Sequence, residues 1–97
     1  MENAMSNRIQ VHQFEGGLKC RTNLQVYQQW RVSELFVIAI DGDENPVGEQ
    51  RSLARFAGMN PNIEVFKDEP TRTICVRDLD KNVVFGSANI DKMHGSA

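Results

Sequence analysis

Two short apolar runs that end in the same acidic pattern constrain the fold of this chain most strongly. The apolar residues 36–40 lead directly into D-x-D-x-N at positions 41–45, and residues 74–77 lead into a second copy at 78–82. Oxygen ligands at alternate positions could hold a Ca²⁺ ion. The same side chains could instead close hairpin turns by accepting hydrogen bonds from their own backbone.

The residues that follow each pattern favour turns. A calcium loop of the EF-hand type needs a glycine at its sixth position and a glutamate at its twelfth. Those two positions hold Pro46 and Ser52 in the first copy, and Val83 and Asn89 in the second. We therefore predict two surface turns and no metal site, and we expect no cofactor elsewhere in the chain.

The composition is that of a single globular domain. Ninety-seven residues can bury one core, and 40% hydrophobic with 25% charged residues is an ordinary balance. The formal net charge of −2 shows no basic excess, so we do not expect a nucleic-acid partner. No run approaches the ~18 apolar residues of a membrane span, so we expect no membrane partner either.

The two cysteines, Cys20 and Cys75, each lie beside an apolar segment that is predicted to form a strand. We expect both to be small buried side chains. A disulfide between them stays open, because a sequence cannot place their Cβ atoms within bonding distance. Residues 1–7 are polar and do not resemble a secretory signal, so we expect a cytoplasmic protein with reduced thiols.

Hydrophobic patterning predicts one α+β domain over residues 8–91. Residues 1–7 are expected to be disordered, and residues 92–97 to form a flexible tail. Residues 23–32 fit a strand or, alternatively, a short helix. The other predicted strands lie at 9–11, 18–21, 35–40, 63–67, 71–77 and 83–85, and the run 35–40 is expected to be buried on both faces.

The clearest predicted helix spans residues 49–57. Leu53, Phe56 and Ala57 have the i, i+3, i+4 spacing of one helical face, and Gly58 suits the position just after a helix. We therefore predict a mostly antiparallel sheet of five or six strands with this one main helix packed on one face.

No group of residues predicts a reaction. His12 is expected on the polar face of the first strand and His94 in the tail, and neither has a carboxylate that the sequence places beside it. A His12–Cys20 pair across the first hairpin is conceivable, but nothing in the pattern supports it. We expect no catalytic residue and lean against an enzyme.

A DNA-binding regulator built on residues 49–67 is one alternative. Ala54 and Gly58 are spaced like the small residue and glycine of a helix-turn-helix. The segment that should form the recognition helix, 63–67, is instead rich in strand-forming residues.

A surface for a protein partner is the remaining hypothesis. Tyr27, Trp30 and Arg31 lie among glutamines, and interfaces favour Tyr, Trp and Arg. If residues 23–32 form one strand, Tyr27 and Trp30 point to opposite faces. We predict a small binding or regulatory module that acts as a homodimer. A ligand-binding or enzymatic domain with a pocket between helix and sheet is the second alternative.

Overall fold

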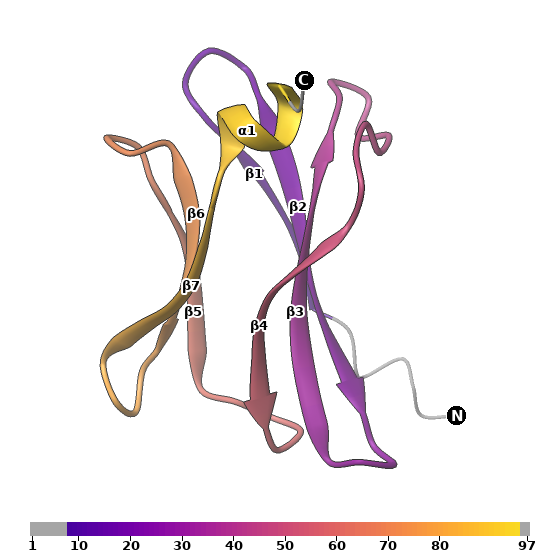
Figure 1. Cartoon of the computed structure of the whole chain (residues 1–97), viewed down its shortest axis with the longest axis vertical. Helices are drawn as coiled ribbons and strands as arrows, with labels where there is room; N and C mark the ends of the chain where they lie inside the picture. The colour runs from indigo at the N-terminus through magenta and orange to yellow at the C-terminus, as the bar shows by residue number, and fades with distance from the viewer. Residues whose placement is uncertain (1–7, 96–97) are drawn as a thin grey trace.

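The computed structural model describes residues 8–95, so the disorder predicted for residues 1–7 lies outside the described part of the chain. Within residues 8–95 the chain is nearly all β (Figure 1). Its elements are β1 (Arg8–Gln13), β2 (Lys19–Tyr27), β3 (Val32–Ile40), β4 (Arg51–Ala57), β5 (Ile63–Asp68), β6 (Thr73–Asp78), β7 (Val83–Asn89) and α1 (Ile90–Gly95).

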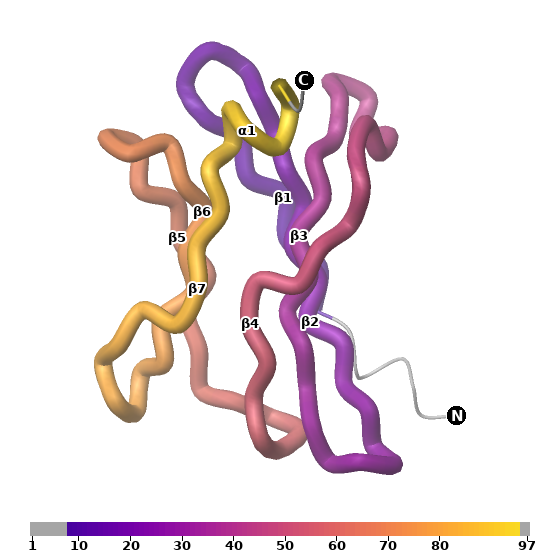
Figure 2. The backbone as a smooth tube through the Cα atoms, viewed as in Figure 1, coloured from indigo at the N-terminus to yellow at the C-terminus, as the bar shows by residue number. Residues whose placement is uncertain are grey.

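The strands form two antiparallel sheets, and this corrects the predicted α+β fold. Sheet A has four strands in the order β1-β2-β3-β4, and sheet B has three in the order β5-β6-β7. The two sheets face each other as the layers of a sandwich (Figures 1 and 2). The prediction of one sheet covered by a helix was wrong, since a second sheet takes the place of that helix.

The predicted helix at 49–57 is strand β4, and a β-bulge explains the misleading spacing. Ala54 pairs with Leu35 and Ser52 pairs with Phe36, so Leu53 is an extra residue in the ladder. A bulge interrupts the two-residue alternation of a strand. Leu53 and Phe56 therefore both pack into the core, which mimics the i, i+3 spacing of a helix.

Alternating burial along β2 and β3 gives sheet A its inner face. Cys20, Thr22 and Leu24 of β2 are buried, and their direct partners on β3 are buried as well. Phe36 and Ile38, on the opposite face of β3, remain partly exposed. Residues 35–40 were expected to be buried on both faces, but only the inner face of this strand is fully buried.

The core lies between the sheets in two adjoining clusters. One cluster is Phe14, Cys20, Val37, Ala39, Ile74, Ile90 and Met93. The other is Leu24, Leu35, Phe56 and Val76. Leu53 and Val65 pack against both, so the bulge residue of β4 helps to join the two halves of the core.

Both acidic patterns form turns, which confirms the turn interpretation. The Oδ1 atom of Asp41 accepts hydrogen bonds from the backbone N–H groups of Asp43 and Asn45, both at 2.9 Å. The Oδ1 atom of Asp78 accepts from the N–H groups of Asp80 and Lys81, at 2.8 and 3.1 Å. Each aspartate thus holds its own loop closed.

Helix α1 closes one end of the sandwich (Figure 1). The Asn89 side chain accepts a hydrogen bond from the N–H of Lys92, as an N-cap residue does. Arg72 makes two bonds to Asp91, at 2.7 and 3.1 Å, and this contact lowers the pKa of Asp91. Residues 92–95, which were assigned to a tail from the sequence, lie within this helix, and Met93 is buried in the core.

We expect replacement of Phe56 by alanine to lower the free energy of unfolding by about 3–5 kcal/mol, because it empties a buried aromatic site. Phe56 is only 7% exposed and stacks on Phe85 with ring centroids 5.6 Å apart. The matched control is Phe85→Ala, which breaks the same stack from a side chain that is 41% exposed. Urea unfolding should show a much smaller loss for the control, and equal losses would mean that Phe56 is not a core residue.

A second prediction concerns Gly86, where β7 lies against β4. A Cβ atom added to Gly86 would overlap the carbonyl oxygen of Leu53. Gly86→Ala should therefore cost about 1–3 kcal/mol, as overpacking does. Gly42→Ala is the control, because nothing lies within 4 Å of a Cβ there. If urea unfolding gave the same midpoint for both variants, the close approach of β4 and β7 would be refuted.

Candidate functional site

Strand β1 carries its polar side chains inward and its apolar side chains outward. Gln10 pairs with Thr22 and His12 pairs with Cys20, and both partners are buried between the sheets. Directly opposite residues of two paired strands share a face. Ile9 and Val11 must therefore lie on the outer face, where they are 60% and 43% exposed. The sequence alternation correctly predicted a strand but did not show which face of it is buried.

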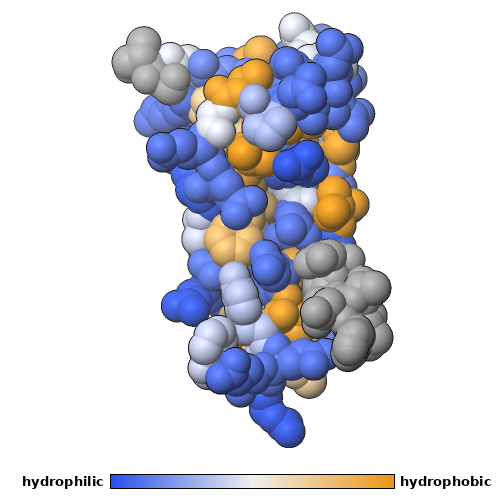
Figure 3. All heavy atoms as spheres, turned by 90° about the vertical axis from the view of Figure 1, so that its right-hand side faces the viewer, coloured by the Kyte–Doolittle hydropathy of each residue, from blue (hydrophilic) through white to orange (hydrophobic). Residues whose placement is uncertain are grey.

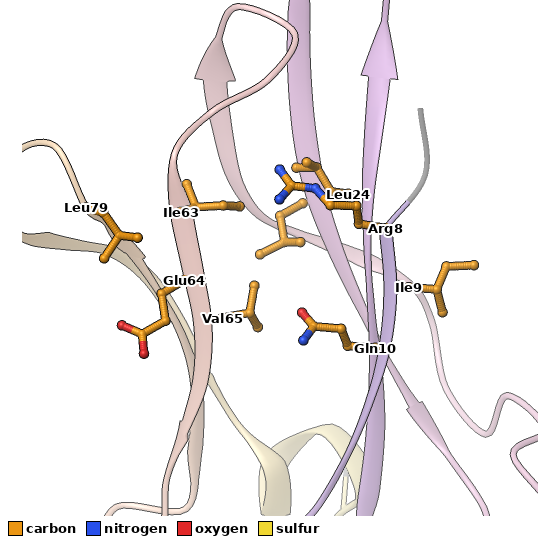
Figure 4. Close-up of a pocket in the computed structure, with 9 residues that line it drawn as sticks. Arg8, Ile9, Gln10, Leu24, Ile63, Glu64, Val65 and Leu79 are labelled. Carbon is orange, nitrogen blue, oxygen red and sulfur yellow. The ribbon is translucent and has the colours of Figure 1, made fainter. Parts of the chain in front are cut away.

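The polar inner side of β1 borders a cleft between the two sheets. The cleft has a volume of about 730 Å³ and runs between β1 and β5, the edge strands of their sheets. Figure 4 shows Arg8 and Gln10 pointing from β1 toward Ile63 and Val65 of β5. Leu24, which is buried, lies beneath them.

Basic side chains bridge the cleft at both ends. Near one end Arg8 donates a long hydrogen bond of 3.4 Å to the carbonyl oxygen of Pro61. Near the other end Lys67 donates to the carbonyl oxygen of Gln13 and forms an ion pair of 3.2 Å with Glu69. The bridges join β1 to β5 through side chains and leave the space between them open.

The outer face of sheet A carries apolar side chains on β1 and β3, on either side of polar side chains of β2. Asn23 has Ile9 and Phe36 as its partners, and Arg21 has Val11 and Ile38. Apolar side chains thus flank a polar residue of β2 in two successive rows. Figure 3 views the molecule from the side that sheet A forms and shows apolar atoms along the middle of a mostly hydrophilic surface.

The structure brings together two of the residues predicted for an interface and places the third beside them. Strand β2 ends at Tyr27, and Trp30 and Arg31 lie in the turn that leads to β3. The Tyr27 and Trp30 rings lie 5.9 Å apart at 51°, and Trp30 is 65% exposed. The two rings do not point to opposite faces, because the strand alternation stops at Tyr27. Arg31 has a φ of 55°, which the tight turn imposes.

His12 and Cys20 are cross-strand partners, but the His12 ring is hydrogen-bonded to Thr22 and the Cys20 thiol is not activated. Burial, and then the nearby Lys67 ammonium, lowers the pKa of His12, whose ring contacts the Thr22 hydroxyl at 2.9 Å. Burial raises the pKa of the Cys20 thiol to about 11, so the reactive thiolate is disfavoured. Both cysteines are free, and the Sγ atom of Cys75 lies within hydrogen-bond distance of the Thr73 hydroxyl, at 3.4 Å.

The hypothesis of DNA binding through residues 49–67 has lost its structural basis. Both halves of that segment are strands, β4 and β5, so neither can act as a recognition helix. The hypothesis of a pocket between helix and sheet required the predicted helix at 49–57, and that segment contains strand β4 instead. The cleft lies between two sheets instead.

The acidic turns give a third prediction. Titration of the protein with Ca²⁺ should show no saturable binding, because the Asp41 and Asp78 Oδ1 atoms already accept two backbone hydrogen bonds each. Residues 8–95 contain no group of three or more His, Cys, Asp or Glu side chains placed to hold a metal. A one-site isotherm in isothermal titration calorimetry would contradict this prediction.

No family model, curated protein or solved structure matches this chain. Among the residues that the structure describes, no helix is long and apolar enough to cross a membrane. A function is therefore proposed below from the arrangement of the described side chains alone.

Proposed function

We propose that this chain is a non-enzymatic interaction module that forms a homodimer by antiparallel pairing of two β1 edges. The observation that carries the proposal is the exposed edge of β1, which has no Asp, Glu, Lys or Arg after Arg8. An unpaired strand edge is a template for another strand, and proteins usually protect such edges with charges, bulges or covering segments.

Each of the other sheet edges in residues 8–95 has some protection. Strands β4 and β7 each contain a bulge, and they lie against each other at Gly86. Strand β5 carries three charged residues among its six. Strand β1 begins with Arg8 and then continues with Ile9-Gln10-Val11-His12-Gln13, in which all residues except the partly buried His12 are exposed. The low pKa of His12 favours its neutral form at pH 7.

The side chains of β1 fit a twofold axis through the middle of the strand. With Gln10 opposite Gln10 of the second copy, Ile9 of each copy faces Val11 of the other. Both exposed apolar residues would then be covered on the outer face, and cross-strand pairs of this kind are the units that stabilise a sheet. Pairing would join two four-stranded sheets into one continuous sheet.

We predict a weak homodimer with a dissociation constant in the micromolar range, since pairing of one edge buries less than a standard interface. Val11→Lys should raise that constant at least tenfold, because it puts two like charges at the centre of the interface. Sedimentation equilibrium over a range of protein concentrations gives the constant, and circular dichroism shows whether the variant stays folded.

The matched control is Val84→Lys, which introduces the same charge on β7 at a residue 46% exposed, close to the 43% of Val11. The control should dimerise like the wild type. A wild-type protein that remains monomeric at high micromolar concentration would refute the proposal. If Val84→Lys dissociates the dimer and Val11→Lys does not, the interface lies at β7 and not at β1.

The exposed Trp30 supports a second candidate surface at the β2–β3 turn. Aromatic side chains that are held close together and exposed are typical of interface anchors. Trp30→Ser belongs in the same sedimentation series. If this variant dissociates the dimer and Val11→Lys does not, the interface is the surface of Tyr27, Trp30 and Arg31 that the sequence suggested.

We also propose that the protein works in the cytoplasm with reduced thiols. The position of Cys20 in the core and the burial of Cys75 support this, since both thiols are free and lie away from solvent. A thiol titration of the unfolded protein, purified without reductant, should count two free cysteines. A count of zero would contradict the proposal.

A further inference from the structure

We propose that the cleft between β1 and β5 binds a small amphipathic carboxylate, with its apolar chain over Ile63 and Val65 and its carboxylate at Arg8. The cleft lies within one chain, so this inference does not depend on the homodimer. It rests on the size of the cleft, the character of its lining and the position of its charges.

The size and ends of the cleft favour a small molecule. A volume of about 730 Å³ is within the roughly 300–1,000 Å³ that small-ligand sites occupy. The Arg8–Pro61 and Lys67–Gln13 bridges cross from sheet to sheet near its two ends. A short ligand fits between these bridges, whereas a polypeptide that ran the length of the cleft would have to break them.

The floor of the cleft is apolar, and its β5 side is apolar except for the charged residue Glu64. Leu24 and Leu35 form the floor and are almost fully buried. Ile63 and Val65 form the β5 side and are partly exposed, so an alkyl chain laid against them would remove apolar surface from water. Gln10 supplies an amide on the β1 side.

The charges of the cleft favour an anionic head group at Arg8. Glu64 also lines the cleft, but Figure 4 shows its side chain pointing away from Arg8, and its carboxylate pairs with Arg77 at 3.6 Å. Lys67 at the other end already forms an ion pair with Glu69. The hydrogen bond from Arg8 to Pro61 is long, and its acceptor is an uncharged carbonyl oxygen. A carboxylate can instead accept two shorter, charge-assisted hydrogen bonds from the same guanidinium.

The test uses three probes with the same alkyl chain: octanoate and octylammonium below their micelle concentrations, and octanol below its solubility limit. Two-dimensional NMR of the labelled protein should show octanoate shifting the amides of Leu24, Ile63 and Val65. Octanoate should bind at least about tenfold more tightly than octanol, and octylammonium more weakly than either. Equal binding of octanoate and octylammonium would overturn the proposal, and so would shifts confined to another part of the chain.

Two variants separate the head-group site from the apolar site. Arg8→Gln should weaken octanoate to the level of octanol, and Arg51→Gln, an exposed control on β4, should change nothing. Gln10→Trp adds an indole to the cleft from an exposed position, so it should abolish binding of both probes while the rest of the spectrum stays folded. Unchanged octanoate affinity in Arg8→Gln would overturn the assignment of the carboxylate.

Two further measurements keep the alternatives distinct. The monomeric Val11→Lys variant should still bind octanoate, because Val11 lies on the outer face of sheet A. Loss of octanoate binding in this folded variant would show that the site needs the dimer and would overturn the single-chain cleft. If an apolar tetrapeptide with a free carboxyl end binds the cleft and octanoate does not, the proposal of a small molecule is wrong, and the ligand is the carboxyl terminus of a polypeptide.

Discussion

The packing of sheet A against β6 is the interaction on which the rest of the structure depends. Ile74 and Val76 of β6 are completely buried, and each belongs to one of the two core clusters. They face the buried rows of β2 and β3, so one apolar layer is shared by both sheets. A three-stranded sheet with one buried face is stable only when another layer covers that face. Sheet B therefore needs sheet A, and helix α1 closes the end of the layer with Ile90 and Met93.

The two sides of the sandwich differ because the edge strands differ in their inward side chains. On the β4–β7 side the inward residues are apolar, and Gly86 lets the backbones lie against each other. On the β1–β5 side the inward residues of β1 are Arg8, Gln10 and His12. Polar groups cannot be packed into a dry core without partners. The β1–β5 side therefore stays open as a cleft that two basic side chains bridge.

The inward placement of the polar side chains of β1 underlies both functional proposals. Its polar residues face the cleft, so its apolar residues Ile9 and Val11 must face solvent, because alternate side chains of a strand lie on opposite faces. A twofold axis perpendicular to a sheet keeps the inner faces of paired strands on the same side. Pairing of two β1 strands would thus cover Ile9 and Val11 and leave each cleft on the inner side. The two proposals are compatible, and each can fail alone.

Local patterns in the sequence were sufficient for most of the strands and for both acidic turns. A two-residue alternation or a short apolar run marks a strand, and an aspartate followed by polar residues bonds to its own backbone, so these features need no distant partner. Of the segment 23–32, residues 23–27 were correctly interpreted as a strand, whereas residues 28–31 form the turn to β3. The interface at Tyr27, Trp30 and Arg31 stays a prediction that rests on the residue types, and the structure adds that Trp30 is exposed.

The partners of each segment were decided only by the tertiary structure. Nothing local distinguishes a short helix from a bulged strand at 51–57, because a bulge reproduces the helical spacing of Leu53 and Phe56. Likewise, the alternation in β1 defines two faces but not which one is buried, and Thr22 and Cys20 of β2 make that choice through their pairing with Gln10 and His12. The cleft arises from residues about 55 positions apart, such as Arg8 and Ile63, which meet only when the two sheets pack. Local propensity is a property of neighbouring residues, whereas burial depends on which layer lies opposite, and here that layer was a second sheet.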